Sequence, residues 1–122
     1  MRAFRLLGAA VFSLTMPASA QTPVLTIELS SFAYAPRTIE LAAGKPVTLT
    51  FVNRSGGAHD FTAKKFFASA RFVAGSAPGG EIELKGGQSR SLTLVPAPGT
   101  YRVHCGHFMH KQFGMSGTIV VR

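Results

Sequence analysis

Short runs of β-branched and apolar residues, separated by turns that contain glycine or proline, make up most of this chain. Residues 47–52 alternate apolar side chains with threonine, which is typical of a half-buried strand. Pro36 interrupts one such run, and Gly86-Gly87 separates two others. We expect further strands at residues 24–29, 38–41, 58–62, 81–84, 89–95, 101–105 and 117–121.

One segment breaks this pattern. Residues 63–74 place Phe66, Phe67, Ala70 and Val73 at helical spacing, which predicts a short helix. Seven or eight short strands and one short helix favour an all-β fold, a Greek-key antiparallel β-sandwich. A chain of 122 residues has room for one such core.

The first 20 residues resemble a cleaved signal peptide. Arg2 and Arg5 precede a mostly apolar stretch, and small residues end at Ala20. The alternative is a membrane anchor, but the apolar run falls short of the roughly 20 residues that span a bilayer. We therefore predict a signal peptide at residues 1–20, export to the periplasm, and a domain at residues 21–122 that does not span the membrane.

The chain is basic, with a formal charge of +8 that falls to +6 once Arg2 and Arg5 are removed. Such a charge attracts nucleic acid, anionic lipid or an acidic protein. Export argues against nucleic acid, and no basic run is longer than Lys64-Lys65. An acidic protein partner is therefore the expectation that remains. We expect the chain itself to be monomeric.

Ligands for a soft metal gather near the C-terminus. Residues 101–117 hold the only cysteine, three of the four histidines and two of the four methionines. Two imidazoles and a thiolate with a weak axial thioether define a blue copper site. Cys105 and Met115 can supply the thiolate and thioether, and His59 is the only histidine outside this segment.

Three histidines compete for the remaining position. Strand alternation places His104 on the face opposite Cys105. His107 is separated from Cys105 by one residue, a tether too tight for both side chains to reach one metal without strain. His110 lies in a loop that can curl over the site, so we predict His59, Cys105, His110 and Met115 as the metal ligands.

The same residues resemble the cupredoxin family, whose chains end in Cys-x4-His-x4-Met and a final strand. Cys105, His110 and Met115 match that ending, and His59 follows a strand and an Asn53-containing loop as the family's first ligand does. The resemblance implies one copper ion per chain, cycling between Cu(I) and Cu(II), and an electron carrier rather than an enzyme. An acidic c-type cytochrome or a membrane oxidase or reductase is the kind of redox partner implied.

Two departures from the family pattern stand out. Many members carry asparagine directly after the first histidine, where its side chain ties the ligand loops together, but this chain has Asp60. An ionised carboxylate accepts hydrogen bonds and cannot donate them, so the tie must differ. The proline that often precedes the second histidine is also missing, and His107-Phe108-Met109 stands there instead. In the family, electrons leave through an apolar patch around the second histidine. Phe108, Met109 and Phe113 could form that patch here, although Phe108 and Phe113 fit the protein core equally well.

Other chemistries fit less well. A nucleophilic Cys105 would leave His59 and Met115 unused, and zinc disfavours a thioether. Copper storage, delivery or resistance is the main alternative function, because His104, His107 and Met109 add soft ligands beside the site.

Overall fold

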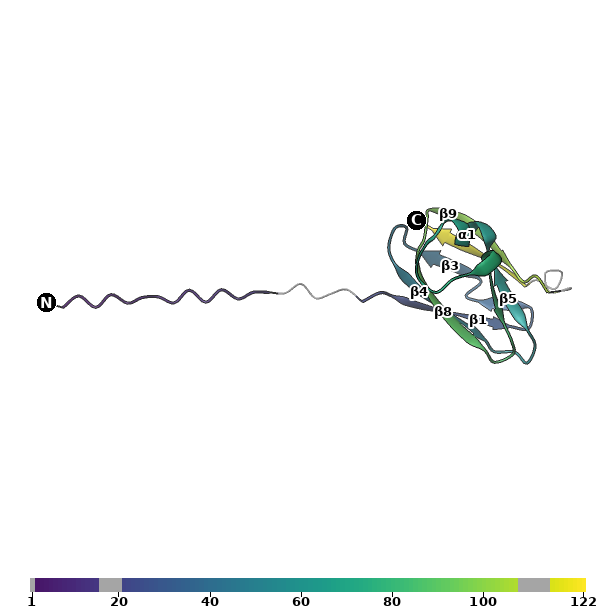
Figure 1. The fold of residues 1–122 in the computed structure, drawn as a ribbon, viewed down its shortest axis with the longest axis horizontal. Helices are drawn as coiled ribbons and strands as arrows, with labels where there is room; N and C mark the ends of the chain where they lie inside the picture. Colours follow the sequence, from purple (N-terminus) through teal and green to yellow (C-terminus); the bar gives the residue numbers. More distant parts are fainter. Residues whose placement is uncertain (1, 16–20, 108–114) are drawn as a thin grey trace.

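Two five-stranded sheets pack face to face in the computed structural model, which describes residues 2–15, 21–107 and 115–122 (Figure 1). The first sheet has the order β2 (Ala33–Ala35), β1 (Val24–Ser30), β4 (Val47–Asn53), β8 (Ser89–Val95) and β6 (Arg71–Ala74). The second has the order β3 (Thr38–Leu41), β10 (Ser116–Val121), β9 (Gly99–His104), β5 (His59–Thr62) and β7 (Glu81–Leu84). The predicted all-β sandwich with one short helix is confirmed.

The sheets are mixed rather than purely antiparallel as predicted. Strand β1 runs parallel to β4, and β3 runs parallel to β10. Between β1 and β4 the chain forms β2 in the first sheet and β3 in the second, so β4 returns in the direction of β1. The remaining pairs are antiparallel.

The predicted helix is only half as long as expected. Helix α1 covers Lys64–Ser69 and buries Phe66 and Phe67, but Ala70 is extended with φ −79° and ψ 151°. Residues Arg71–Ala74 form β6, which pairs with the edge of β8. Val73 is 56% exposed, so it does not extend the apolar stripe of the helix. Aromatic and β-branched residues fit a pleated sheet edge, and pairing with β8 decides this segment against the helical spacing.

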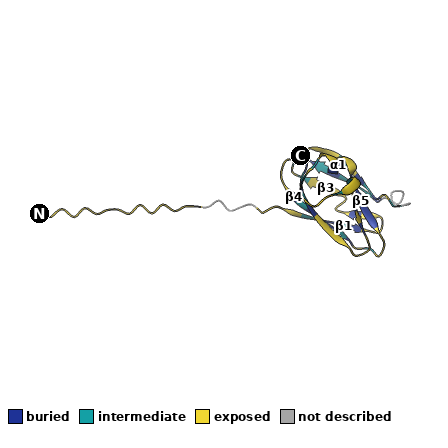
Figure 2. Ribbon diagram, viewed as in Figure 1, coloured by how far each residue is buried: buried dark blue, intermediate teal, exposed yellow. Residues whose placement is uncertain are grey.

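Aromatic rings join the two sheets. Phe61 in β5 packs against Phe51 in β4 at a centroid distance of 4.9 Å, and against Tyr34 at 5.4 Å. Phe67 of α1 meets the same ring at 6.2 Å. All four residues of β5 are buried, including the outward-facing Asp60 and Thr62 (Figure 2). Strand β5 is therefore covered on both faces. This packing fixes the position of His59, with which the strand begins.

The N-terminal segment contributes nothing to the sandwich core. Residues 2–15 form neither helix nor strand, and their side chains are exposed. Within the described ranges no helix is long and apolar enough to cross a membrane. The signal-peptide boundary after Ala20 falls at residues 16–20, outside the described residues, and stays a prediction.

Buried Asn53 organises the loop that leads to β5. Its Nδ2 group donates to the main-chain oxygens of Gly57 at 2.8 Å, Lys85 at 3.1 Å and Leu84 at 3.2 Å. Its Oδ1 accepts from the amide and hydroxyl of Ser55 at 3.0 and 2.8 Å. One amide side chain thus holds the loop before His59 against the hairpin that follows β7.

Replacing Asn53 with aspartate tests this role with almost no change of shape. Asn53→Asp leaves three carbonyl oxygens facing a carboxylate that has no hydrogen to donate. We expect a loss of about 2–4 kcal/mol in the free energy of unfolding, measured by urea denaturation.

Gln88→Glu is the matched control, because Gln88 uses its side-chain oxygen to accept the Lys85 amide hydrogen at 2.9 Å. Glutamate keeps that acceptor, so the control should change stability by less than about 0.5 kcal/mol. Equal losses in the two variants would contradict the role given to the Asn53 donor.

Candidate metal centre

Three of the four predicted ligands lie at one end of the sandwich. His59 begins β5, Cys105 follows β9, and Met115 precedes β10. Their residues are 4%, 1% and 0% exposed. The Cys105 amide donates to the Met115 carbonyl at 3.2 Å, which places the thiol and thioether residues on adjoining strand ends. His110 lies outside the described residues, as do Phe108, Met109 and Phe113.

A backbone contact joins β5 to the thiol. The amide N–H of Asp60 donates to Cys105 Sγ at an N···S distance of 3.5 Å. Since Asp60 directly follows His59, this bond brings the first predicted ligand residue next to the cysteine. The structure therefore assembles His59, Cys105 and Met115 from segments far apart in the sequence.

The Asp60 carboxylate ties the two ligand segments together. Its oxygens accept the Gly106 amide hydrogen at 2.9 and 3.0 Å, and Oδ1 also accepts the Thr62 hydroxyl at 2.7 Å. Each of these partners is a donor, as an ionised carboxylate requires. The sequence predicted that Asp60 would join the ligand segments differently from the asparagine of other family members. In the structure the carboxylate joins them by accepting hydrogen bonds only.

Two neighbours allow this close packing. A Cβ atom on Gly106 would lie 3.1 Å from Asp60 Oδ2, so glycine lets the loop approach the carboxylate. Tyr34 donates its hydroxyl to the Asp60 carbonyl oxygen at 2.6 Å. Burial raises the pKa of Tyr34, and the nearby Cys105 and Asp60 raise it further, so the phenol stays a neutral donor.

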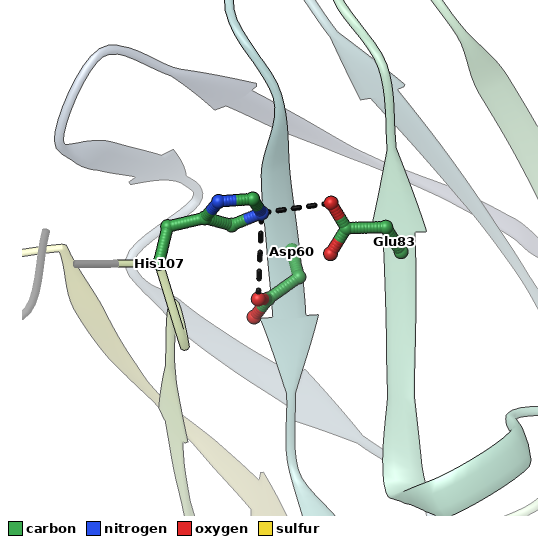
Figure 3. A group of neighbouring side chains, drawn as sticks. All are labelled: Asp60, Glu83 and His107. Carbon is green, nitrogen blue, oxygen red and sulfur yellow. Dashed lines mark hydrogen bonds and ion pairs between the residues drawn. The ribbon is translucent and has the colours of Figure 1, made fainter.

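His107 is held by carboxylates. Its Nε2 lies 2.7 Å from Glu83 Oε1 and 3.9 Å from Asp60 Oδ2 (Figure 3). Asp60 and Glu83 face each other across the β5–β7 pair, and the imidazole lies beside both. These contacts engage Nε2 of His107, and the choice of His110 as the ligand from this loop stays a prediction. His104 is half-buried and pairs within the second sheet with Thr62 of β5 and Ser116 of β10.

Sequence reasoning did not find Glu83 or Tyr34. The alternation of residues 81–84 places Glu81 and Glu83 on one face of a strand, but only the strand register puts Glu83 opposite Asp60. Tyr34 belongs to a short strand on the far side of Pro36, and its contact with Asp60 spans 26 residues. Neither position carries a local signal.

The environment of Cys105 disfavours its thiolate when no cation is present. Burial is the main cause that raises the pKa of the Cys105 thiol, and the negative charges of Asp60 and Glu83 raise it further. The backbone N–H groups of Asp60 and His107 act in the opposite direction. A bound cation would reverse this balance, because thiolates coordinate metals in the deprotonated form.

The raised thiol pKa predicts slow alkylation of the metal-free protein. Only the thiolate reacts with iodoacetamide, so the rate should begin to rise at a higher pH in the folded protein than in the same chain unfolded in urea. Cys105 is the only cysteine, so mass spectrometry follows it without ambiguity. A folded-state profile that lies at lower pH than the unfolded one would contradict this prediction.

Comparison with known proteins assigns this arrangement to one family. The model of the cupredoxin-like domain matches residues 3–121. No curated protein matches the chain.

Solved structures agree with the fold. An auracyanin from Roseiflexus castenholzii, determined after dithionite reduction, superposes with a TM-score of 0.62 at 24% identity, over 84% of this chain and 98% of that one. Auracyanin B gives a TM-score of 0.61 at 26% identity, over 94% and 96% of the two chains. A multicopper oxidase from Campylobacter jejuni gives 0.64 at 12% identity over 89% of this chain, which spans about a third (32%) of the oxidase.

Proposed function

Because this chain belongs to the cupredoxin-like family, we propose that it binds one copper ion as a type 1 copper protein and carries single electrons between redox partners in the periplasm. One observation carries the proposal. A thiol, an imidazole and a thioether residue, Cys105, His59 and Met115, are all buried at the same end of the sandwich. We assign His110 as the fourth ligand, on sequence spacing.

The donor set fits copper better than other common metals. Thiolate and thioether ligands select copper over magnesium or calcium, and a thioether is foreign to zinc sites. When bound, copper would supply a one-electron change between Cu(II) and Cu(I). The burial of Cys105 and Met115 keeps water away from the sulfur ligands, and such shielding affects the reduction potential.

The chain's own contribution is to hold the donors still. The Asp60 and His107 amides lower the pKa of the Cys105 thiol against the larger, opposite effect of burial, and the carboxylate of Asp60 fixes the segment that follows Cys105. Strand β5 holds His59 between two packed faces. An electron carrier benefits from such fixed ligands, because a site that moves little on changing oxidation state needs little reorganisation.

The proposed partner is an acidic redox protein, such as a c-type cytochrome or a membrane oxidase or reductase. The formal charge is +8 for the whole chain and +6 once Arg2 and Arg5 are removed with the predicted signal peptide, and a charge of this sign would steer such a partner by long-range attraction. We propose a monomeric carrier without catalytic activity of its own. Association rates with an acidic partner should then fall as salt concentration rises.

Copper binding is tested by adding Cu(II) to the purified protein and recording visible and EPR spectra. We expect an intense thiolate-to-copper band that disappears on reduction and returns on oxidation. Cys105→Ser should abolish the band, and His59→Ala and His110→Ala should abolish it or change it strongly, because each removes a proposed ligand.

His107→Ala is the matched control, since it removes an imidazole from the same loop. That variant should keep the band, because His107 is engaged by Glu83. Loss of copper on each reduction, or its transfer to an acceptor protein, would favour copper delivery over electron transfer. No band, with Cys105 still reactive as a free thiol, would overturn the copper proposal.

A further inference from the structure

A buried negative charge lies directly beside the proposed copper ligands. The Asp60 side chain is 5% exposed, and its backbone amide contacts Cys105 Sγ. We propose that Asp60 is a positioning residue whose charge sets the reduction potential of the copper centre, by favouring the oxidised form. This inference rests on the proposed function and assigns control of the reduction potential to one residue.

The sign follows from the charges of the two states. A Cu(II)–thiolate unit carries one positive charge, whereas a Cu(I)–thiolate unit is neutral. A nearby fixed negative charge attracts the first and has no net attraction for the second. Salt screens buried charges much less than exposed ones, so the effect should persist at physiological ionic strength. A neutral side chain in the same place would lack this preference.

The contacts of Asp60 keep its charge in place without cancelling it. Its carboxylate accepts from the Gly106 amide and the Thr62 hydroxyl, both of which are neutral dipoles. In the part of the chain that the structure describes, no lysine or arginine lies within ion-pair distance of Asp60. Among the described residues, the basic group in ion-pair contact with it is His107, whose Nε2 is 3.9 Å from Oδ2 and much closer to Glu83 (Figure 3).

Glu83 should act in the same direction but more weakly. It faces Asp60 across the β5–β7 pair, yet its side chain is 47% exposed, so solvent screens its charge. Glu81 lies on the same strand and face, two residues farther along, and pairs with Thr62. The chain thus provides a graded series of three carboxylates with Glu81 as a matched control.

The experiment measures the copper reduction potential by redox titration of the visible band. It compares the full chain with Asp60→Asn, Glu83→Gln and Glu81→Gln, in buffer to which no divalent cation other than the bound copper is added, so that none neutralises the carboxylates. We expect Asp60→Asn to raise the ratio of Cu(I) to Cu(II) at fixed ambient potential about tenfold, equivalent to about +59 mV for one electron. Glu83→Gln should give a smaller rise, and Glu81→Gln none.

A second measurement separates charge from structure. Thermal unfolding of each variant is recorded with Cu(I) and with Cu(II), and the charge effect predicts that Asp60→Asn loses more stability in the Cu(II) form. A purely structural role would lower both forms equally and leave the potential unchanged, which would overturn the inference. If Asp60→Asn does not retain copper, the test rests on the other two variants. Equal reduction potentials for Glu83→Gln and Glu81→Gln would then overturn the inference. An unmodified chain without the blue band overturns the proposed function itself.

Discussion

The bond between the Asp60 carboxylate and the Gly106 amide is the interaction on which the site depends. The two residues are 46 positions apart, and they bring the start of β5 to the segment that follows β9. This bond holds the Asp60 amide beside Cys105 Sγ, and glycine at position 106 favours it, since a Cβ atom there would lie 3.1 Å from Asp60 Oδ2. Removing the acceptor would take this partner from the Gly106 amide and loosen the tie between the two ligand-bearing segments.

The same arrangement sets like charges against each other. Asp60 and Glu83 are directly opposed in an antiparallel pair, a placement that destabilises a sheet. The imidazole of His107 lies beside both, with Nε2 2.7 Å from Glu83 Oε1 and 3.9 Å from Asp60 Oδ2. Two of the chain's five acidic residues thus meet at the proposed copper site of a basic protein. The local field at the site is therefore opposite in sign to the field that would steer a distant partner.

Local patterns in the sequence predicted the strands well, because alternation and turn residues act over a few neighbours. They failed at Arg71–Ala74, where pairing with β8 outweighs helical spacing, and at the direction of β1 against β4, which depends on the path between them. Residue chemistry alone selected Cys105, Met115 and His59 as candidate ligands, and the structure brings these three residues to one end of the sandwich. The Tyr34 and Glu83 contacts could not be found in this way, since both arise from register and long-range packing.

Asp60, where many family members have asparagine after the first histidine, changes two properties at once: the hydrogen bonding of the loop tie and the charge at that position. It makes the loop tie accept hydrogen bonds only, so the facing segment must present donors, and the Gly106 amide and Thr62 hydroxyl do so. It also fixes a negative charge where the family pattern has a neutral amide. The Gly106 amide and Thr62 hydroxyl that hold the carboxylate in place also hold its charge in the residue whose amide contacts Cys105 Sγ. Structure at this residue and the electrostatics of the copper site are therefore one constraint, set by a single side chain.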